Sequence, residues 1–174
     1  MNVYYTKTAL YAYPNIMAIA DQIDELVERR AILSMNDYSP AIEQCEKVID
    51  LTSQKDALFA LRLYLDKALS GLSDYDMDCL EYKYFKRKGK EYFVGFDFES
   101  RNYFRKQVRL VKKISNKLEK AGANDKWFEE FCMSMDFFKE LFKRVIEHEK
   151  NSLKNKKKPK KNLTKSEQEK RQTA

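Results

Sequence analysis

The sequence has few of the residue types on which metal sites and cross-linked folds depend. His148 is the only histidine, and the three cysteines, Cys45, Cys79 and Cys132, are far apart. Structural zinc sites draw on several closely spaced Cys or His ligands, so we predict no metal and no cofactor. Because the cysteines are odd in number and each lies in an apolar pattern, we expect them to be reduced core residues.

Glycine and proline are also scarce, with four and three residues among 174. No Gly-rich phosphate loop or nucleophile elbow occurs, so we expect no enzyme, and an active site built from helical carboxylates stays the alternative. Few turn residues and 43% apolar residues predict an all-α helical bundle. No run of 18 apolar residues and no signal-peptide pattern occur, so we expect a cytoplasmic protein without a membrane partner.

The net charge of +7 is divided very unevenly along the chain. Residues 1–80 carry 7 basic and 13 acidic side chains, and residues 121–149 carry 4 and 7. Residues 81–120 carry 13 basic and 5 acidic side chains, and residues 150–174 carry 10 and 2. Positive charge gathered in one internal segment and one tail favours a polyanionic partner.

Residues 1–70 are predicted to form an N-terminal helical region. Pro14 suits the start of a helix because its missing N–H would be unpaired there. The apolar residues that follow are spaced as in a bundle helix or as in a seam between two chains, and both interpretations stay open. They are Ile16, Ile19, Ile23, Leu26 and Leu33.

A second helix is expected from Ser39-Pro40 to Gly71, with an undecided break at Thr52-Ser53. Its apolar positions include Ile42, Cys45, Val48, Ile49, Leu58, Leu61 and Leu65.

The next helix has a well-specified start. Ser73 is its predicted N-cap, Leu72 and Met77 form a hydrophobic staple, and the helix runs to about Phe85.

Residues 100–120 have the pattern of a strongly basic amphipathic helix. Ser100 is placed to cap its start, and Gly122 supplies the left-handed residue after its end. Basic side chains fill most of its surface outside one apolar stripe. The stripe consists of Phe104, Val108, Val111, Ile114 and Leu118.

The C-terminal part divides into an aromatic segment, residues 123–150, and a basic tail, residues 151–174. The aromatic segment is predicted to form one or two helices on the same core. The tail has almost no apolar residues and is expected to be disordered, except where it continues the preceding helix. The aromatic and aliphatic positions are Trp127, Phe128, Phe131, Phe138, Leu141, Phe142, Val145 and Ile146.

Part of the chain resembles the helix-turn-helix of sigma factor region 4, in the style of ArpU- and RinA-type phage transcriptional regulators. The phrase Leu80-Glu81-Tyr82-Lys83-Tyr84-Phe85 is followed, after 14 residues, by Ser100-Arg101-Asn102-Tyr103-Phe104. Tyr92-Phe93-Val94 falls where the scaffold helix of such a module would lie. By its residues alone, segment 86–99 could be a short aromatic strand or helical turns.

This resemblance implies a DNA-binding module over residues 71–122 with helix 100–120 as its recognition helix. The implied function is sequence-specific binding of double-stranded DNA in transcription regulation. The residues expected to face base edges are Arg101, Asn102, Arg105 and Lys106, and those expected to hold phosphates are Arg109, Lys112 and Lys113.

Two alternatives stay open beside this interpretation. One is a sigma-like partner of RNA polymerase, and the other is a helical adaptor whose basic face binds an acidic protein. A homodimer through the N-terminal helix is compatible with all three.

The lack of closely spaced ligands predicts that the fold does not depend on a metal. The melting midpoint should therefore be the same with and without EDTA in a thermal scan. A midpoint that falls by several degrees in EDTA would reveal a bound structural metal.

Overall fold

The computed structural model describes residues 1–34, 41–85 and 101–157, and every regular element in these ranges is helical. This confirms the predicted all-α class. Within the same ranges, none of the helices has the length and apolarity that a membrane span requires. The main helices are α1 (Val3–Ala12), α2 (Ile16–Ser34), α3 (Ala41–Leu69), α4 (Asp74–Leu80), α5 (Arg101–Ala121), α6 (Asp125–Trp127) and α7 (Asp136–Lys157). The short turns are η1 (Tyr13–Asn15), η2 (Glu81–Phe85) and η4 (Phe128–Cys132).

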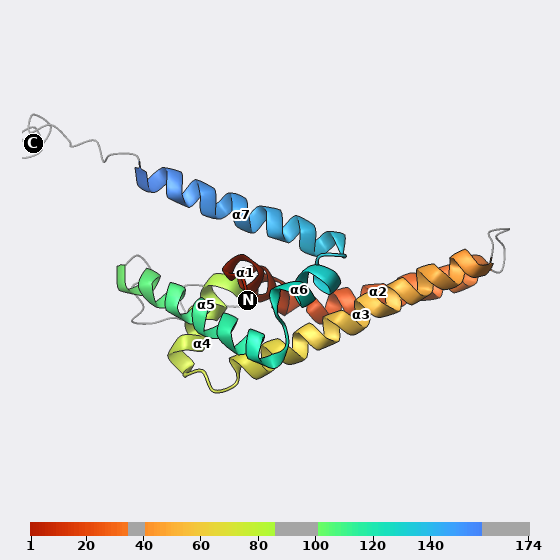
Figure 1. The fold of residues 1–174 in the computed structure, drawn as a ribbon, viewed down its shortest axis with the longest axis horizontal. Coiled ribbons are helices and arrows are strands. Elements are labelled where there is room, and N and C mark those ends of the chain that lie inside the picture. The colour runs from red at the N-terminus through yellow and green to blue at the C-terminus, as the bar shows by residue number, and fades with distance from the viewer. Residues whose placement is uncertain (35–40, 86–100, 158–174) are drawn as a thin grey trace, which may run out of the picture.

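The helices form a body and a projecting arm (Figure 1). The body holds α1, α4, α5 and α6, with α7 lying along one side. The arm consists of α2 and α3, which run beside each other and extend away from the body.

Helix α1 lies at the centre of the body, and its position was not predicted from the sequence. It packs against α3, α5, α7 and the π-helical turn η2. Ala9, Leu10 and Ala12 are buried, and so are the polar residues Thr6 and Thr8. The two hydroxyls donate to backbone carbonyls one turn earlier, Thr6 to Asn2 and Thr8 to Tyr4. Because these hydroxyls are satisfied within the helix, they can be buried without an unpaired polar group.

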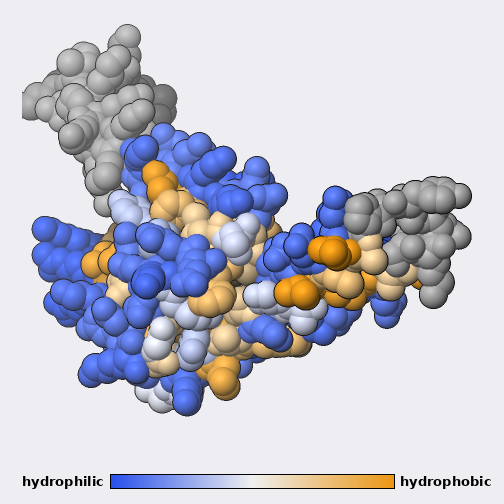
Figure 2. Space-filling view, turned by 45° about the vertical axis from the view of Figure 1, so that its right-hand side comes forward, coloured by the Kyte–Doolittle hydropathy of each residue, from blue (hydrophilic) through white to orange (hydrophobic). Residues whose placement is uncertain are grey.

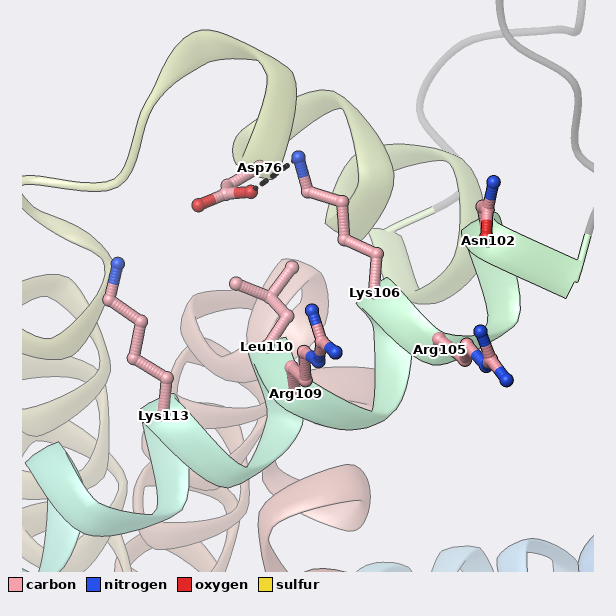
Figure 3. Close-up of a pocket in the computed structure, with 7 residues that line it drawn as sticks. All are labelled: Asp76, Asn102, Arg105, Lys106, Arg109, Leu110 and Lys113. Carbon is pink, nitrogen blue, oxygen red and sulfur yellow. Dashed lines mark ion pairs between the residues drawn. The ribbon is translucent and has the colours of Figure 1, made fainter.

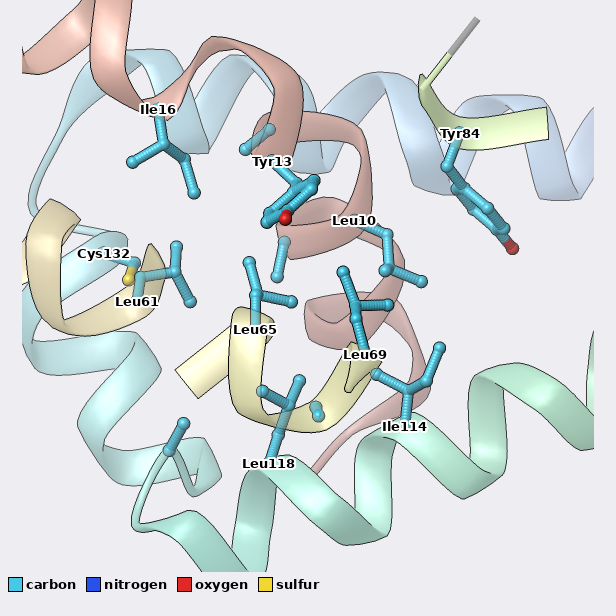
Figure 4. Packing of buried hydrophobic residues seen from close by; sticks show 14 of the residues in the cluster. Leu10, Tyr13, Ile16, Leu61, Leu65, Leu69, Tyr84, Ile114, Leu118 and Cys132 are labelled. Carbon is cyan, nitrogen blue, oxygen red and sulfur yellow. The ribbon is translucent and has the colours of Figure 1, made fainter. Parts of the chain in front are cut away.

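One hydrophobic core joins segments from most of the chain length (Figure 4). Leu10 of α1 lies near Leu65 and Leu69 of α3, and α5 adds Ile114 and Leu118 from the other side. Cys132, Phe128 and Phe138 of the C-terminal segment belong to the same cluster.

Several predicted helix boundaries agree with the structure. Gly71 has φ +76° and follows the end of α3, and Ser73 accepts a hydrogen bond from the Asp76 N–H at the start of α4. The helix continues through η2 to Phe85, as expected. Pro14 lies in η1, the turn that leads into α2. Ser39 and Pro40 lie outside the described residues.

Helix α3 is one continuous helix across Thr52-Ser53, which settles the question of a break. The Thr52 hydroxyl donates to the Val48 carbonyl at 2.9 Å. A threonine satisfied in this way does not need a turn or cap conformation, so the helix passes through it.

The apolar stripe of α2 mostly faces the same chain. Ile16 and Ile23 are buried, Ile19 is partly buried against the core, and Leu26 is 46% exposed. These side chains pack within the chain because α3 runs alongside α2. In this chain the stripe packs as a bundle helix, which is one of the two interpretations that the sequence left open.

The expectation of three buried cysteines is wrong for one of them. Cys79 and Cys132 are buried and reduced, whereas Cys45 is exposed on the arm. Ile42 and Ile49, on the same helix, are exposed as well. The arm has only two helices, so the side of α3 that faces away from α2 has no cover within the described chain.

The aromatic C-terminal segment packs on α1, as its spacing predicted for a core element. The Tyr5 ring lies 4.9 Å from Phe128 and 5.2 Å from Phe142, measured between centroids. Helix α7 continues to Lys157, so residues 151–157 of the expected tail are helical. These residues extend the preceding helix, which was the open alternative.

Two neighbouring phenylalanines of α7 provide a test of this packing. Phe138 is fully buried with its ring edge against Phe128, whereas Phe137 is exposed. Phe138→Ala should lower the free energy of unfolding by about 3–5 kcal/mol because it leaves a cavity. Phe137→Ala, the matched control, should cost much less. Urea titration measures both, and equal losses would contradict the placement of α7.

Candidate nucleic-acid interface

Helix α5 has one buried face and one exposed basic face. The buried face combines apolar and polar residues, and it packs on α1, α3 and α4. Its members are Tyr103, Gln107, Leu110, Val111, Ile114, Ser115 and Leu118.

The prediction of a buried apolar stripe is wrong for the N-terminal half of α5. Val111, Ile114 and Leu118 are buried, but Phe104 is 50% exposed and Val108 is 70% exposed. Tyr103 and Gln107 occupy the buried side there instead. By its hydropathy, Gln107 is expected at the surface. The sequence therefore predicted that Phe104 and Val108 would be buried instead.

The NH2 group of the Gln107 amide is hydrogen-bonded at this buried position, whereas its Oε1 has no hydrogen-bond partner among the described residues. Its Nε2 donates to the Cys79 carbonyl at 2.8 Å and to the Tyr103 hydroxyl at 3.0 Å. Burial raises the pKa of Tyr103 to about 12, so this phenol stays protonated at neutral pH. The network fixes α5 to the end of α4 and thereby sets which face of α5 is exposed. No sequence signal pointed to Gln107 as a structural residue.

The C-terminal end of α5 is fixed by a Schellman motif. Gly122 has φ +108°, its N–H donates to the Glu119 carbonyl, and the Ala123 N–H donates to the Leu118 carbonyl. The predicted role of Gly122 is therefore confirmed. Ser100, the predicted N-cap, lies outside the described residues.

The exposed face of α5 is a continuous, mainly cationic surface. Arg101, Asn102, Arg105, Arg109, Lys112 and Lys113 are all exposed. At 100° per residue, these six positions span about 120° of the helix circumference. Between α5 and α4 lies a groove of about 500 Å³, lined by Asp76, Asn102, Arg105, Lys106, Arg109, Leu110 and Lys113.

Lys106 differs from the other predicted site residues because its charge is already engaged. Its Nζ lies 3.0 Å from Asp76 Oδ1 and 3.4 Å from the centroid of the Tyr75 ring. Figure 3 shows Lys106 reaching toward Asp76, whereas Arg105 is turned away from it. Lys106 therefore connects α5 to α4 and is not available in this arrangement to face a base edge.

Lys117, on the same helix, is also used inside the fold. Its Nζ donates to the carbonyls of Ala68 (3.0 Å) and Ser70 (3.1 Å). Both carbonyls lie at the C-terminal end of α3, where a cation satisfies unpaired acceptors and the negative end of the helix dipole. The basic residues of α5 thus divide into two that hold neighbouring helices and a larger exposed group.

The described residues contain no candidate metal site. They contain no group of three or more His, Cys, Asp or Glu side chains placed to hold a metal ion. His148 is exposed on α7.

The chain matches no protein-family model, no curated protein and no solved structure. The scaffold segment of the expected helix-turn-helix, including Tyr92-Phe93-Val94, lies outside the described residues. The structure therefore defines an all-α protein with a basic helix face, and the sigma-like module stays a prediction.

The contrast between Lys106 and Arg105 can be tested without any ligand. Lys106→Met should lower the free energy of unfolding by about 1 kcal/mol, because it removes a half-exposed ion pair and a cation–π contact. Arg105→Met, the neighbouring control, should leave stability nearly unchanged. A double-mutant cycle with Asp76→Asn in urea titrations measures the coupling. No difference between the two variants would show that Lys106 does not hold α5 to α4.

Proposed function

We propose that this protein is a transcriptional regulator that binds double-stranded DNA sequence-specifically through α5. The exposed cationic face of α5 carries the proposal. An α-helix with its side chains is about 10–12 Å across, and the major groove of B-DNA is about 12 Å wide. A helix with one buried face and one exposed basic face fits this groove.

The placement of α5 at the edge of the body supports this geometry. All six exposed site residues lie between Arg101 and Lys113, in the N-terminal two thirds of the helix. Figure 1 shows this end of α5 at the outer edge of the molecule, away from the arm. A duplex could approach it without meeting α2 or α3.

The electrostatics of α5 favour a phosphate backbone. The helix carries eight basic residues and one acidic residue, Glu119. Asp76, the acidic residue that lines the groove, is neutralised by Lys106. The field over the exposed face is therefore positive, and it would attract DNA at long range.

The exposed residues have distinct proposed roles. Arg101, Asn102 and Arg105 would face base edges, since Asn and Arg make paired hydrogen bonds to adenine and guanine. Arg109, Lys112 and Lys113 would bind phosphates. We assign Lys106 to positioning α5, in place of the base contact expected from the sequence.

The test begins by selecting preferred duplexes from genomic DNA fragments. With such a duplex, Arg105→Ala should weaken binding by about 1–3 kcal/mol and relax the preference at one base pair. Lys113→Ala should weaken binding to all duplexes alike and reduce the salt slope by about 1. Fluorescence anisotropy over a salt series measures both, and neither variant should change the melting midpoint.

Arg29→Ala is the matched control because Arg29 is an exposed arginine of α2, on the arm. It should leave DNA affinity unchanged. The proposal fails if Arg105→Ala and Lys113→Ala keep full affinity at low salt while deletion of residues 158–174 abolishes binding. Retention of RNA polymerase without retention of DNA would favour the sigma-like partner instead.

A further inference from the structure

Helix α3 carries a second, mainly apolar stripe beside the face that contacts α2, and Lys55, which pairs with Asp24 of α2, borders it at Phe59. Its residues follow one another at alternating steps of three and four, which is the spacing of a coiled-coil seam. All of them are exposed, and Ile42 and Ile49 are 73% and 65% exposed. We call this stripe the outer seam: Ile42, Cys45, Ile49, Thr52, Asp56, Phe59 and Leu63.

The outer seam is distinct from the contact between α3 and α2. That contact uses another face of α3, where Leu58 and Leu65 are buried and Leu51 is partly buried. The ion pair of Lys55 Nζ with Asp24 Oδ1, at 2.6 Å, places α2 on that side. Figure 2 shows strongly hydrophobic side chains on the surface of the arm. Scattered exposed apolar residues are ordinary, but here five of seven successive seam positions are apolar.

The position of Asp56 selects the direction in which a second α3 would pair. In a parallel pair each seam residue faces its own copy, so two Asp56 carboxylates would meet in the seam. Like charges in such a position are destabilising. In an antiparallel pair, the first seam position of each heptad faces the fourth position of a heptad in the partner. Only then do the three-residue intervals of the two seams lie opposite each other.

One antiparallel register then sorts the seam by chemistry. It places Cys45 opposite Leu63, Ile49 opposite Phe59, and Thr52 opposite Asp56, each pair occurring twice by symmetry. Apolar residues meet apolar residues, and Asp56 meets Thr52, the other polar seam residue, whose hydroxyl donates to Val48 of its own helix. Ile42 falls at the rim of this pairing.

Charge along α3 favours the same direction. The first part of the helix holds Glu43, Glu46 and Asp50 against one Lys47. The second part holds Lys55, Arg62 and Lys67 against Asp56 and Asp66, a net charge of +1 where the first part has −2. Lys55 and Arg62 also form ion pairs within the chain, with Asp24 and Asp66. Antiparallel pairing places the acidic part opposite the part that carries these cations, whereas parallel pairing places acid beside acid.

We propose that the outer seam of α3 is a homodimer interface in which the α3 helices of two chains pair antiparallel. The residues from Cys45 to Leu63, which pair in this register, give a contact about 28 Å long at 1.5 Å per residue. The interface uses α3, not the α2 stripe that the sequence suggested. It is independent of the proposed DNA binding, and its test needs no DNA.

The first experiment is light scattering of the full chain over a concentration series. The wild type should reach twice the 20.7 kDa chain mass. Ile49→Glu should remain at the single-chain mass with an unchanged melting midpoint, because Ile49 is exposed in the single chain. Ile32→Glu is the matched control: Ile32 is 64% exposed but lies on α2, off the seam. It should still dimerise.

The second experiment tests the direction. Leu63→Cys should form a covalent dimer with oxidised glutathione, through a disulfide between the introduced thiol of one chain and Cys45 of the other. The same variant with Cys45→Ser should not. A wild type that stays monomeric at the highest concentration overturns the proposal, as does an Ile49→Glu dimer. A Cys45–Cys45 disulfide in the oxidised wild type would overturn the antiparallel direction.

Discussion

The burial of α1 is the constraint on which the rest of the body depends. This ten-residue helix contacts α3, α5, α7 and η2, so the other elements are arranged around its surface. It can take this position because its fully buried residues are small or apolar and because Thr6 and Thr8 satisfy their hydroxyls within the helix. A larger polar residue at either threonine would leave an unpaired group in the core.

The candidate interface follows from how α5 is held against this core. Its buried face is fixed by Ile114 and Leu118 at one end and by the Gln107 network at the other. Lys106 and Lys117 attach it to α4 and to the end of α3. These contacts engage two of the basic side chains of α5. The remaining basic side chains lie on its exposed face. The exposed basic face is therefore a consequence of the packing as much as of composition.

Local chemistry made parts of the fold predictable from sequence. Ser73, Gly71 and Gly122 have the predicted roles because caps and left-handed turns depend on a few adjacent residues. The exposure of the residues proposed for DNA contact was also predictable, except for Lys106, and their role stays a prediction. The predicted burial of Phe104 and Cys45 was wrong because burial depends on which distant helices pack beside them. Helix α1 was missed because a helix surrounded on most sides shows no amphipathic period.

The continuity of α3 has a mechanical consequence for the whole molecule. Sharp kinks in helices nearly always need proline, glycine or a local break in the hydrogen-bond ladder, and residues 41–69 contain neither proline nor glycine. The helix is therefore a stiff rod of about 44 Å, at 1.5 Å per residue. Its C-terminal end is bound by Lys117 of α5. A force on the tip of the arm would therefore be carried along α3 to its contact with α5.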